Sequence, residues 1–271
     1  MSHRTPIALT IAGSDSSGGA GIQADLKTFT ALGVYGASVV TALTAQNTQG
    51  VQAVEVPSAA FIVRQIDSVL ADLRVDAAKT GMLANIEVVR AVAARLAGTG
   101  IALVVDPVMI ATSGDALLTP DAVAAMRDEM MPLAYVVTPN LAEAARLLDT
   151  AVATTVEEAT HQAGALSARA GVPVLVKGGH GSGGDAVDVL SAGGQIRTFS
   201  RPRVETRHTH GTGCTLSAAI AAGIAQGFPL EGAIAMAKDY VWRGLEAGRT
   251  LGVGHGNGPV DHLHGIRSRQ A

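Results

Sequence analysis

Short apolar runs rich in β-branched residues alternate along the chain with longer segments in which apolar residues recur every three or four positions. The first pattern is typical of strands and the second of helices. The predicted strands are Ile7–Ile11, Val39–Leu43, Val51–Val56, Ala77–Thr80, Leu103–Asp106, Tyr135–Thr138, Val174–Lys177, Val187–Leu190 and Gln195–Phe199. The predicted helices are Gly21–Leu32, Ala59–Leu73, Ile86–Ala97, Pro120–Met130, Leu141–Leu148, Val156–Ala170, Thr215–Gln226 and Leu230–Gly248.

Several predicted strands, such as those ending at Asp106 and Lys177, carry apolar side chains at consecutive positions. Strands of this kind are covered by helices on both faces of a sheet. Together with the strand–helix alternation, this predicts an α/β fold with a mostly parallel central sheet and helices on both faces. No linker, charge block or internal repeat divides the sequence, so we expect a single domain over residues 1–271.

Polar and glycine residues follow six of the predicted strands. Ligands of open parallel sheets bind beyond the carboxyl ends of the strands, so a repeated polar pattern there indicates a binding site. The six segments are Gly13-Ser14-Asp15, Ala45-Gln46-Asn47, Thr80-Gly81-Met82, Asp106-Pro107-Val108, Thr138-Pro139-Asn140 and Lys177-Gly178-Gly179-His180.

Composition excludes several classes of protein. A net charge of −3 and an aromatic content of 3% argue against a nucleic-acid binder. The single cysteine, Cys214, excludes an intramolecular disulfide and a cysteine-based zinc site. The longest uncharged stretch, Thr28–Val54, contains several amide side chains that would be costly in a bilayer, and the N-terminus has no export signal. We therefore expect a cytoplasmic enzyme.

Three glycine-rich stretches are candidates for phosphate binding. Gly179–Gly184 precedes a predicted strand rather than a helix, so we interpret it as a flexible loop. Gly19–Ala24 fits the spacing of a dinucleotide loop, but no acidic residue follows at the right distance, which leaves an NAD-dependent oxidoreductase a remote alternative. Gly211 and Gly213 precede a helix expected to begin near Cys214, where backbone N–H groups and the helix dipole favour an anion. The local pattern fits a glycine turn before a buried helix equally well.

Taken in order along the chain, these motifs resemble the hydroxymethylpyrimidine/phosphomethylpyrimidine kinases, the thiamine-pathway branch of the ribokinase-like superfamily. The resemblance extends to nearly the whole sequence. Its segments are Ala8–Asp15, Gly18–Lys27, Ala45–Asn47, Lys79–Met82, Asp106–Val108, Thr138–Asn140 with Glu143, Lys177–His180, His210–Cys214 and Gly254–Pro259.

The resemblance implies a Mg²⁺- and ATP-dependent kinase. Such an enzyme phosphorylates 4-amino-5-hydroxymethyl-2-methylpyrimidine and then its monophosphate, giving the diphosphate used in thiamine biosynthesis. It also implies a ribokinase-like domain without a separate lid, commonly paired as a homodimer. Pyridoxal kinase of the same branch is the alternative, because pyridoxal also carries a hydroxymethyl group on an aromatic ring. A regulatory binding module is disfavoured because the sequence shows no appended domain.

For catalysis, the resemblance assigns the backbone of Gly211, Thr212 and Gly213 to the transferring phosphoryl group. Cys214 stands where most ribokinase-like enzymes carry the aspartate that accepts the hydroxyl proton. A thiol at a helix N-terminus is expected to have a lowered pKa, so a thiolate base is chemically reasonable. The alternative is that Cys214 only shapes the anion site.

The resemblance also implies three sets of binding residues. Gln46 can donate and accept hydrogen bonds at an aminopyrimidine edge. An Asn-x-x-Glu pattern is equally a helix capping box, and a lysine on a helix often only snorkels. The implied residues are Gly13, Asp25, Gln46, Met82 and Val108 for the pyrimidine, Asn140, Lys177 and Lys238 for the nucleotide, and Asp106 and Glu143 for Mg²⁺.

One position departs from the family pattern. His208 stands where a small polar residue is expected, and with His210 it forms a His-x-His string. A metal site there is disfavoured, because no third histidine lies close by in the sequence.

Overall fold

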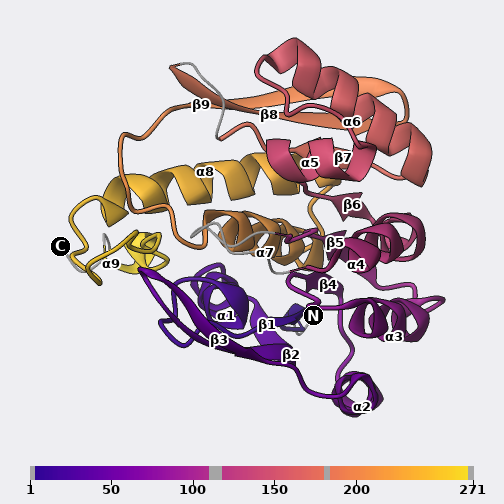
Figure 1. Ribbon diagram of the computed structural model, residues 1–271. Helices are drawn as coiled ribbons and strands as arrows, with labels where there is room; N and C mark the ends of the chain where they lie inside the picture. The colour runs from indigo at the N-terminus through magenta and orange to yellow at the C-terminus, as the bar shows by residue number, and fades with distance from the viewer. Residues whose placement is uncertain (1–3, 110–117, 180–183, 268–271) are drawn as a thin grey trace.

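A twisted nine-stranded sheet forms the centre of the molecule in the computed structural model, which describes residues 4–109, 118–179 and 184–267. The strand order is β3-β2-β1-β4-β5-β6-β7-β8-β9, and Figure 1 shows the ribbon of strands running from the β2–β3 hairpin at the bottom to β8–β9 at the top. The strands are β1 (Ile7–Gly13), β2 (Tyr35–Asn47), β3 (Gly50–Glu55), β4 (Ala77–Thr80), β5 (Ala102–Val105), β6 (Val136–Val137), β7 (Val174–Val176), β8 (Asp185–Ala192) and β9 (Gln195–Pro202).

The predicted mostly parallel sheet is confirmed. Strands β2, β1, β4, β5, β6 and β7 pair in parallel, so their carboxyl ends meet at one edge. The antiparallel pairings, β2 with β3, β7 with β8 and β8 with β9, lie towards the two sides of the sheet.

Helices cover both faces of the sheet. One face packs against α1 (Gly21–Ala31), α7 (Thr212–Ala225) and α8 (Leu230–Gly248). The other packs against α2 (Ala59–Asp72), α3 (Ile86–Leu96), α4 (Pro120–Ala125), α5 (Leu141–Leu148) and α6 (Val156–Ala170). Within β5, Leu103 and Val105 join one core and Val104 the other. This two-sided burial is the reason for the consecutive apolar positions in the sequence.

Several boundaries differ from the sequence prediction. Strand β2 continues to Asn47 because its last residues pair with β3, so Ala45-Gln46-Asn47 lies within a strand and not after it. The predicted helix Pro120–Met130 ends as an α-helix at Ala125 and continues as a π-helical turn. A short 3₁₀ turn that contains Pro132 follows, and a proline is expected to end a helix in this way.

Two further differences concern the carboxyl-terminal half. Helix α7 begins at Thr212, three residues earlier than predicted, so Gly213 and Cys214 lie in its first turn. A short helix, α9 (His264–Arg267), was not predicted. The predicted loop Gly179–Gly184 lies largely outside the described residues, but the predicted strand after it is present as β8. Across the described part of the chain, every helix is too short or too polar to cross a lipid bilayer.

Candidate active site

The glycine turn before α7 is the first component of the candidate site. Gly211 has a φ of +76°, and a methyl group on its Cα would lie 1.8 Å from the carbonyl oxygen of Gly19. Only glycine fits this conformation and this close approach. The turn leads directly into α7, whose first N–H groups lack partners within the helix and whose dipole adds positive charge. The geometry therefore provides a site for an anion at residues 211–214.

A cluster of charged side chains lies against this turn. The Lys177 Nζ atom is 2.7 Å from Asp106 Oδ1 and 3.9 Å from Glu143 Oε2. A methyl group built on Gly213 would lie 3.4 Å from the same Nζ atom, so the ammonium group borders the first turn of α7. Ser217, one turn further along α7, donates a hydrogen bond to Asp106 Oδ2 at 3.1 Å. The structure thus brings the predicted Asp106, Glu143 and Lys177 together.

Local backbone structure explains how Glu143 reaches this cluster. Asn140 and Glu143 form a reciprocal capping box at the start of α5, with hydrogen bonds of 2.7 and 2.9 Å, as the Asn-x-x-Glu pattern predicts. Asn140 also forms an isolated parallel bridge with Lys177, which sets β6 beside β7 at the sheet edge. The cap holds the carboxyl group of Glu143 at the sheet edge, within 3.9 Å of Lys177.

Burial and neighbouring charges shift the pKa values of Glu143 and Lys177 in this cluster. Burial raises the pKa of Glu143 to about 7, and the Lys177 ammonium only partly opposes this rise. For Lys177, burial alone would lower the pKa, but Asp106 and Glu143 outweigh it and raise the pKa. Lys177 therefore stays positively charged next to the anion turn.

The donor set of this cluster fits Mg²⁺ but not a transition metal. Asp106 and Glu143 supply hard carboxylate oxygens, and Mg²⁺ typically takes one or two carboxylates together with waters and substrate phosphates. Among the described residues, no group of three or more histidine, cysteine, aspartate or glutamate side chains is close enough to hold a metal without such help.

Cys214 lies in the first turn of α7, half-buried, and its sulfur accepts a hydrogen bond from the Gly21 N–H group. The expected lowering of its pKa is wrong for this structure. Loss of solvent around the sulfur raises the pKa of Cys214 to about 11, and the nearby Lys79 ammonium only partly compensates. The thiol is therefore neutral at physiological pH.

Below Cys214, Asp25 and Lys79 form a buried ion pair. The Lys79 Nζ atom lies 2.9 Å from both carboxylate oxygens of Asp25, and Thr10 Oγ1 donates to Asp25 Oδ2 at 2.7 Å. Burial raises the pKa of Asp25, and the ammonium group opposes that rise. Sequence analysis placed Asp25 beside the pyrimidine. In the structure, its oxygens are engaged by protein groups in the floor of the site.

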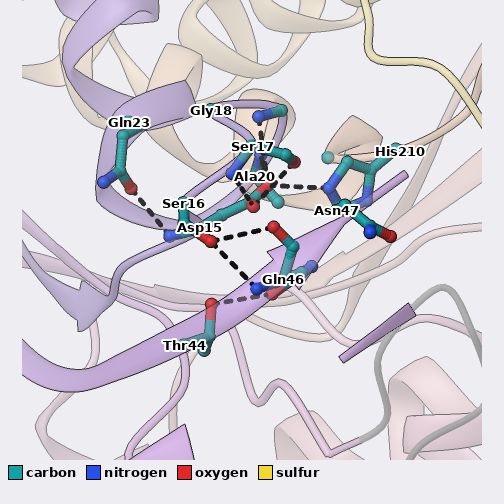
Figure 2. A network of polar contacts seen from close by, with 12 residues as sticks. Asp15, Ser16, Ser17, Gly18, Ala20, Gln23, Thr44, Gln46, Asn47 and His210 are labelled. Atoms are coloured by element: carbon teal, nitrogen blue, oxygen red, sulfur yellow. Dashed lines mark hydrogen bonds and ion pairs between the residues drawn. The ribbon is translucent and has the colours of Figure 1, made fainter. Parts of the chain in front are cut away.

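Other predicted pyrimidine residues lie at the same edge of the sheet, at or after the ends of β1, β2, β4 and β5. A methyl group on Gly13 would lie 3.3 Å from the Met82 sulfur, so these two positions are neighbours. The half-buried side chain of Gln46 accepts a hydrogen bond from Thr44 Oγ1 at 3.2 Å, as Figure 2 shows. Val108 is half-buried two residues after Asp106 at the same edge of the sheet.

Lys238 pairs with a different carboxylate from the one that pairs with Lys177. Its Nζ atom lies 2.7 Å from Asp188 Oδ2, and its side chain is 11% exposed, so it does not snorkel to solvent. The other oxygen of Asp188 accepts the Gly178 N–H at 3.0 Å. Lys238 is thus connected through Asp188 to the residue after Lys177.

Sequence analysis missed the roles of Asp15 and His210, although both lie in the quoted motifs. The imidazole Nε2 of His210 is 2.7 Å from Asp15 Oδ2. For Asp15, the sequence did contain an indication of this role: the aspartate precedes a run of small residues, a pattern typical of a side chain that organises a turn. His208 accepts a hydrogen bond from the Gly258 N–H at 3.0 Å, so the two histidines of the His-x-His string have separate partners.

The dinucleotide interpretation of Gly19–Ala24 is wrong. The N–H groups of Gly19 and Ala20, which a pyrophosphate would need, donate instead to Asp15 Oδ2 at 3.0 and 2.8 Å. The loop before α1 is thus already filled by a carboxylate of the chain itself.

Comparison with known proteins decides the family. Residues 15–261 match the sequence profile of the family described as phosphomethylpyrimidine kinase. The chain belongs to this family. It is 56% identical over 260 residues to a hydroxymethylpyrimidine/phosphomethylpyrimidine kinase of Rhizobium meliloti, and the match covers 96% of this chain and 98% of that protein.

Solved structures of two kinases have the same fold. The phosphomethylpyrimidine kinase of Clostridium difficile 630 superposes with a TM-score of 0.77 at 41% identity, covering 87% of this chain and 97% of the other. The pyridoxal kinase of Bacillus subtilis, in an ADP complex, gives a TM-score of 0.89 at 35% identity, with 97% and 99% coverage. The ribokinase-like α/β fold expected from the sequence is confirmed.

Proposed function

We propose that the protein is an ATP-dependent kinase that phosphorylates 4-amino-5-hydroxymethyl-2-methylpyrimidine and then converts the monophosphate into the diphosphate. The observation that carries this proposal is the position of Lys177, Asp106 and Glu143 against the glycine turn of α7, in a chain of this family. A cation, two carboxylates and a backbone anion site are the components that phosphoryl transfer requires.

In this proposal the anion turn binds the transferring phosphoryl group. The backbone N–H groups of Gly211 and Gly213 and the Lys177 ammonium stabilise the negative charge that develops during transfer. The N–H group of Thr212, also expected to bind the phosphoryl group, donates to the Thr209 carbonyl at 3.2 Å in this structure. In this proposal the nucleotide is bordered by Asn140, which bridges Lys177 after β7, and by Lys238, which is paired with Asp188 of β8. Because these donors are fixed by α7 and the sheet, little reorganisation is needed as the charge develops.

Asp106 and Glu143 would hold Mg²⁺ together with the phosphates of ATP. When bound, the ion neutralises phosphate charge and orients the terminal phosphoryl group. The two side chains are suited to this role because Lys177 and Ser217 fix Asp106, while the capping box fixes Glu143.

The pyrimidine binds, in this proposal, between Gly13, Gln46, Met82 and Val108, above the Asp25–Lys79 pair. The Gln46 amide pairs with the amino group and a ring nitrogen of the substrate. This places the hydroxymethyl group towards Cys214 and the anion turn. The neutral thiol of Cys214 shapes the turn, and phosphoryl transfer depends mainly on positioning and on charge stabilisation around it, with the hydroxyl proton leaving to a phosphate oxygen or to water as the ester forms.

Pyridoxal kinase activity is the second candidate. The observation that favours it is the superposition on the Bacillus subtilis pyridoxal kinase, with a TM-score of 0.89. The identity of 56% to an enzyme named for the pyrimidine activities favours the pyrimidine as the principal substrate.

The purified protein should be incubated with ATP, Mg²⁺ and either hydroxymethylpyrimidine or pyridoxal, and the products followed by mass spectrometry. We expect the pyrimidine monophosphate to appear first and the diphosphate to follow. A reaction that stops at the monophosphate would contradict the second activity, and preferential phosphorylation of pyridoxal would reverse the choice of substrate.

We infer that the chain forms one kinase domain, since both hydrophobic cores pack on one continuous sheet. The homodimer expected from the resemblance stays a prediction. A molar mass in solution of twice the 27.4 kDa of the chain would support it.

A further inference from the structure

The carboxylate of Asp15 organises the loop between β1 and α1. Its Oδ1 accepts hydrogen bonds from the N–H and hydroxyl groups of Ser17 at 2.8 and 2.7 Å. Its Oδ2 accepts the N–H groups of Gly19 and Ala20 at 3.0 and 2.8 Å. Figure 2 shows the carboxylate at the centre of this network. One side chain thus fixes the path of the loop that leads into α1.

His210 approaches the same carboxylate from the far end of the sequence. Its Nε2 lies 2.7 Å from Asp15 Oδ2, and both side chains are buried. Although burial opposes ionisation, hydrogen bonds from His210 and Ser17 lower the pKa of Asp15 to about 2. An ionised carboxylate only accepts hydrogen bonds, so Nε2 of His210 carries a proton and donates it. A contact of this kind is charge-assisted and comparatively strong.

The two loops fit together without spare room. A methyl group on Gly19 would lie 2.4 Å from His210 Cδ2, and one on Gly211 would lie 1.8 Å from the Gly19 carbonyl oxygen. The backbone of His210 is also fixed, because its main-chain N–H group donates to the Gly258 carbonyl at 3.1 Å. A shift of one loop therefore requires a shift of the other.

Each loop carries a different half of the candidate site. On one side, Ser16 accepts the Gln46 N–H at 2.9 Å and donates to the Gln46 carbonyl at 2.8 Å, which fixes the end of β2. The same loop ends at Gly21, whose N–H contacts the sulfur of Cys214. On the other side, His210 immediately precedes the anion turn. The contact between Asp15 and His210 thus joins the pyrimidine side to the phosphoryl side.

We propose that Asp15 and His210 are positioning residues that set the distance and orientation between the bound pyrimidine hydroxymethyl group and the phosphoryl group on the anion turn. This inference rests on the proposed function. The two side chains act through Gln46 and through the backbone of the turn, without touching either substrate. Misplacement of reacting groups by about 1 Å can cost 10²-fold in rate, so an indirect contact of this kind can control catalysis.

Two substitutions of His210 separate positioning from general packing. The side-chain nitrogen of glutamine reaches the position of Nε2 and can donate to Asp15, whereas the nitrogen of asparagine is too close to the backbone to do so. We expect His210→Asn and Asp15→Asn each to lower kcat with the pyrimidine by roughly 10- to 100-fold. His210→Gln should restore most of the rate. ATP affinity should change much less than kcat in all three, and His161→Asn on the exposed surface of α6 is the matched control.

The double variant tests whether the two residues act as one unit. If they do, Asp15→Asn combined with His210→Asn should lower kcat no further than either single substitution. Multiplicative losses, equal losses in the Gln and Asn variants of His210, or a His210→Asn variant with a normal kcat would each overturn the proposal.

Alkylation of Cys214, the single cysteine of the chain, provides a readout that does not depend on the substrate. A loosened contact between the loops should expose the sulfur, so we expect His210→Asn to be alkylated several-fold faster than wild type and His210→Gln at the wild-type rate. Thermal unfolding confirms that each variant is folded. If the wild-type protein fails to phosphorylate hydroxymethylpyrimidine, the proposed function falls, while the alkylation rates still test the contact. Equal alkylation rates in all variants would contradict it.

Discussion

The Nζ atom of Lys79 lies 2.9 Å from each carboxylate oxygen of Asp25, and both side chains are completely buried. Burial alone would lower the pKa of Lys79, but the charge of Asp25 reverses this effect and raises it. The pair therefore places a compensated charge in the floor of the candidate site, between β4 and α1.

Removal of one member of this pair should destabilise the fold. Lys79→Met leaves the Asp25 carboxylate buried with Thr10 as its one remaining donor among the described residues, which typically costs about 3–5 kcal/mol in the free energy of unfolding. Urea denaturation measures this difference. Replacing both partners, with Lys79→Met and Asp25→Leu together, should recover much of the loss, because no uncompensated charge remains. A single variant as stable as wild type would contradict this account.

Asp15 should make stability depend on acid pH. Its pKa in the folded state is about 2, compared with an ordinary value of 3.8. Because the pKa of Asp15 is lowered in the folded state, the stability that its ionised carboxylate contributes is complete above about pH 4 and is lost as the pH falls towards 2. The difference corresponds to roughly 2 kcal/mol. In Asp15→Asn, unfolding followed between pH 5 and 2 should therefore show a shallower loss of stability than wild type; parallel curves would argue against this origin.

Gln46→Ala should weaken binding of the pyrimidine and leave ATP binding nearly unchanged. Loss of the amide removes a paired donor and acceptor and leaves buried polar atoms of the substrate without partners, which costs roughly 1–3 kcal/mol. Calorimetric titration of each substrate measures the two affinities. Gln52→Ala on β3 is the control, because that exposed amide bonds to the nearby Gly50 carbonyl in the hairpin. An unaltered pyrimidine affinity would remove Gln46 from the site.

Cys214→Ala should reduce kcat only slightly. Removal of a general base would reduce kcat by about 10²–10⁴-fold. The thiol has a pKa of about 11 and is neutral in the free enzyme, and the substitution keeps the backbone N–H groups of the turn. Cys214→Asp should be more harmful, because it adds a negative charge near Asp25 and Asp106.

The pH dependence of alkylation checks the ionisation of this thiol directly. The rate of reaction of Cys214 with iodoacetamide should continue to rise towards pH 11. A large loss of kcat in the alanine variant, accompanied by loss of one limb of the pH–rate profile, would instead establish the thiolate as the base.

Lys177 and Lys238 should differ in effect. Lys177→Met removes the ammonium beside the anion turn and should lower kcat by about 10²–10³-fold, as loss of one stabilising donor does elsewhere. Lys238→Met breaks a buried pair with Asp188 and should mainly lower the melting temperature, with a smaller change in the KM for ATP. Steady-state kinetics and thermal unfolding of both variants distinguish the two roles, and identical kinetic defects would contradict the distinction.

Much of the fold could be predicted because local pattern and tertiary environment agree. Consecutive apolar residues in β5 identify a strand buried on both faces, and Asn140 with Glu143 identifies the start of α5. The end of β2 could not be predicted, since its last residues depend on pairing with β3 rather than on their own propensity. The early start of α7 likewise depends on Gly211, whose conformation is fixed by the approach of Gly19.

The fold class, the edge of the sheet that carries the candidate site, and the motifs that resemble the pyrimidine kinases could all be predicted from the order of residues. These follow from periodicity and from residue types in order, which are properties of the chain alone. The charge state of Cys214, the burial of Asp25 with Lys79, and the contact between Asp15 and His210, which are 195 residues apart, required the folded structure. The reason is physical: pKa values and long-range hydrogen bonds depend on solvent exclusion and on neighbours that the fold brings together from distant parts of the chain.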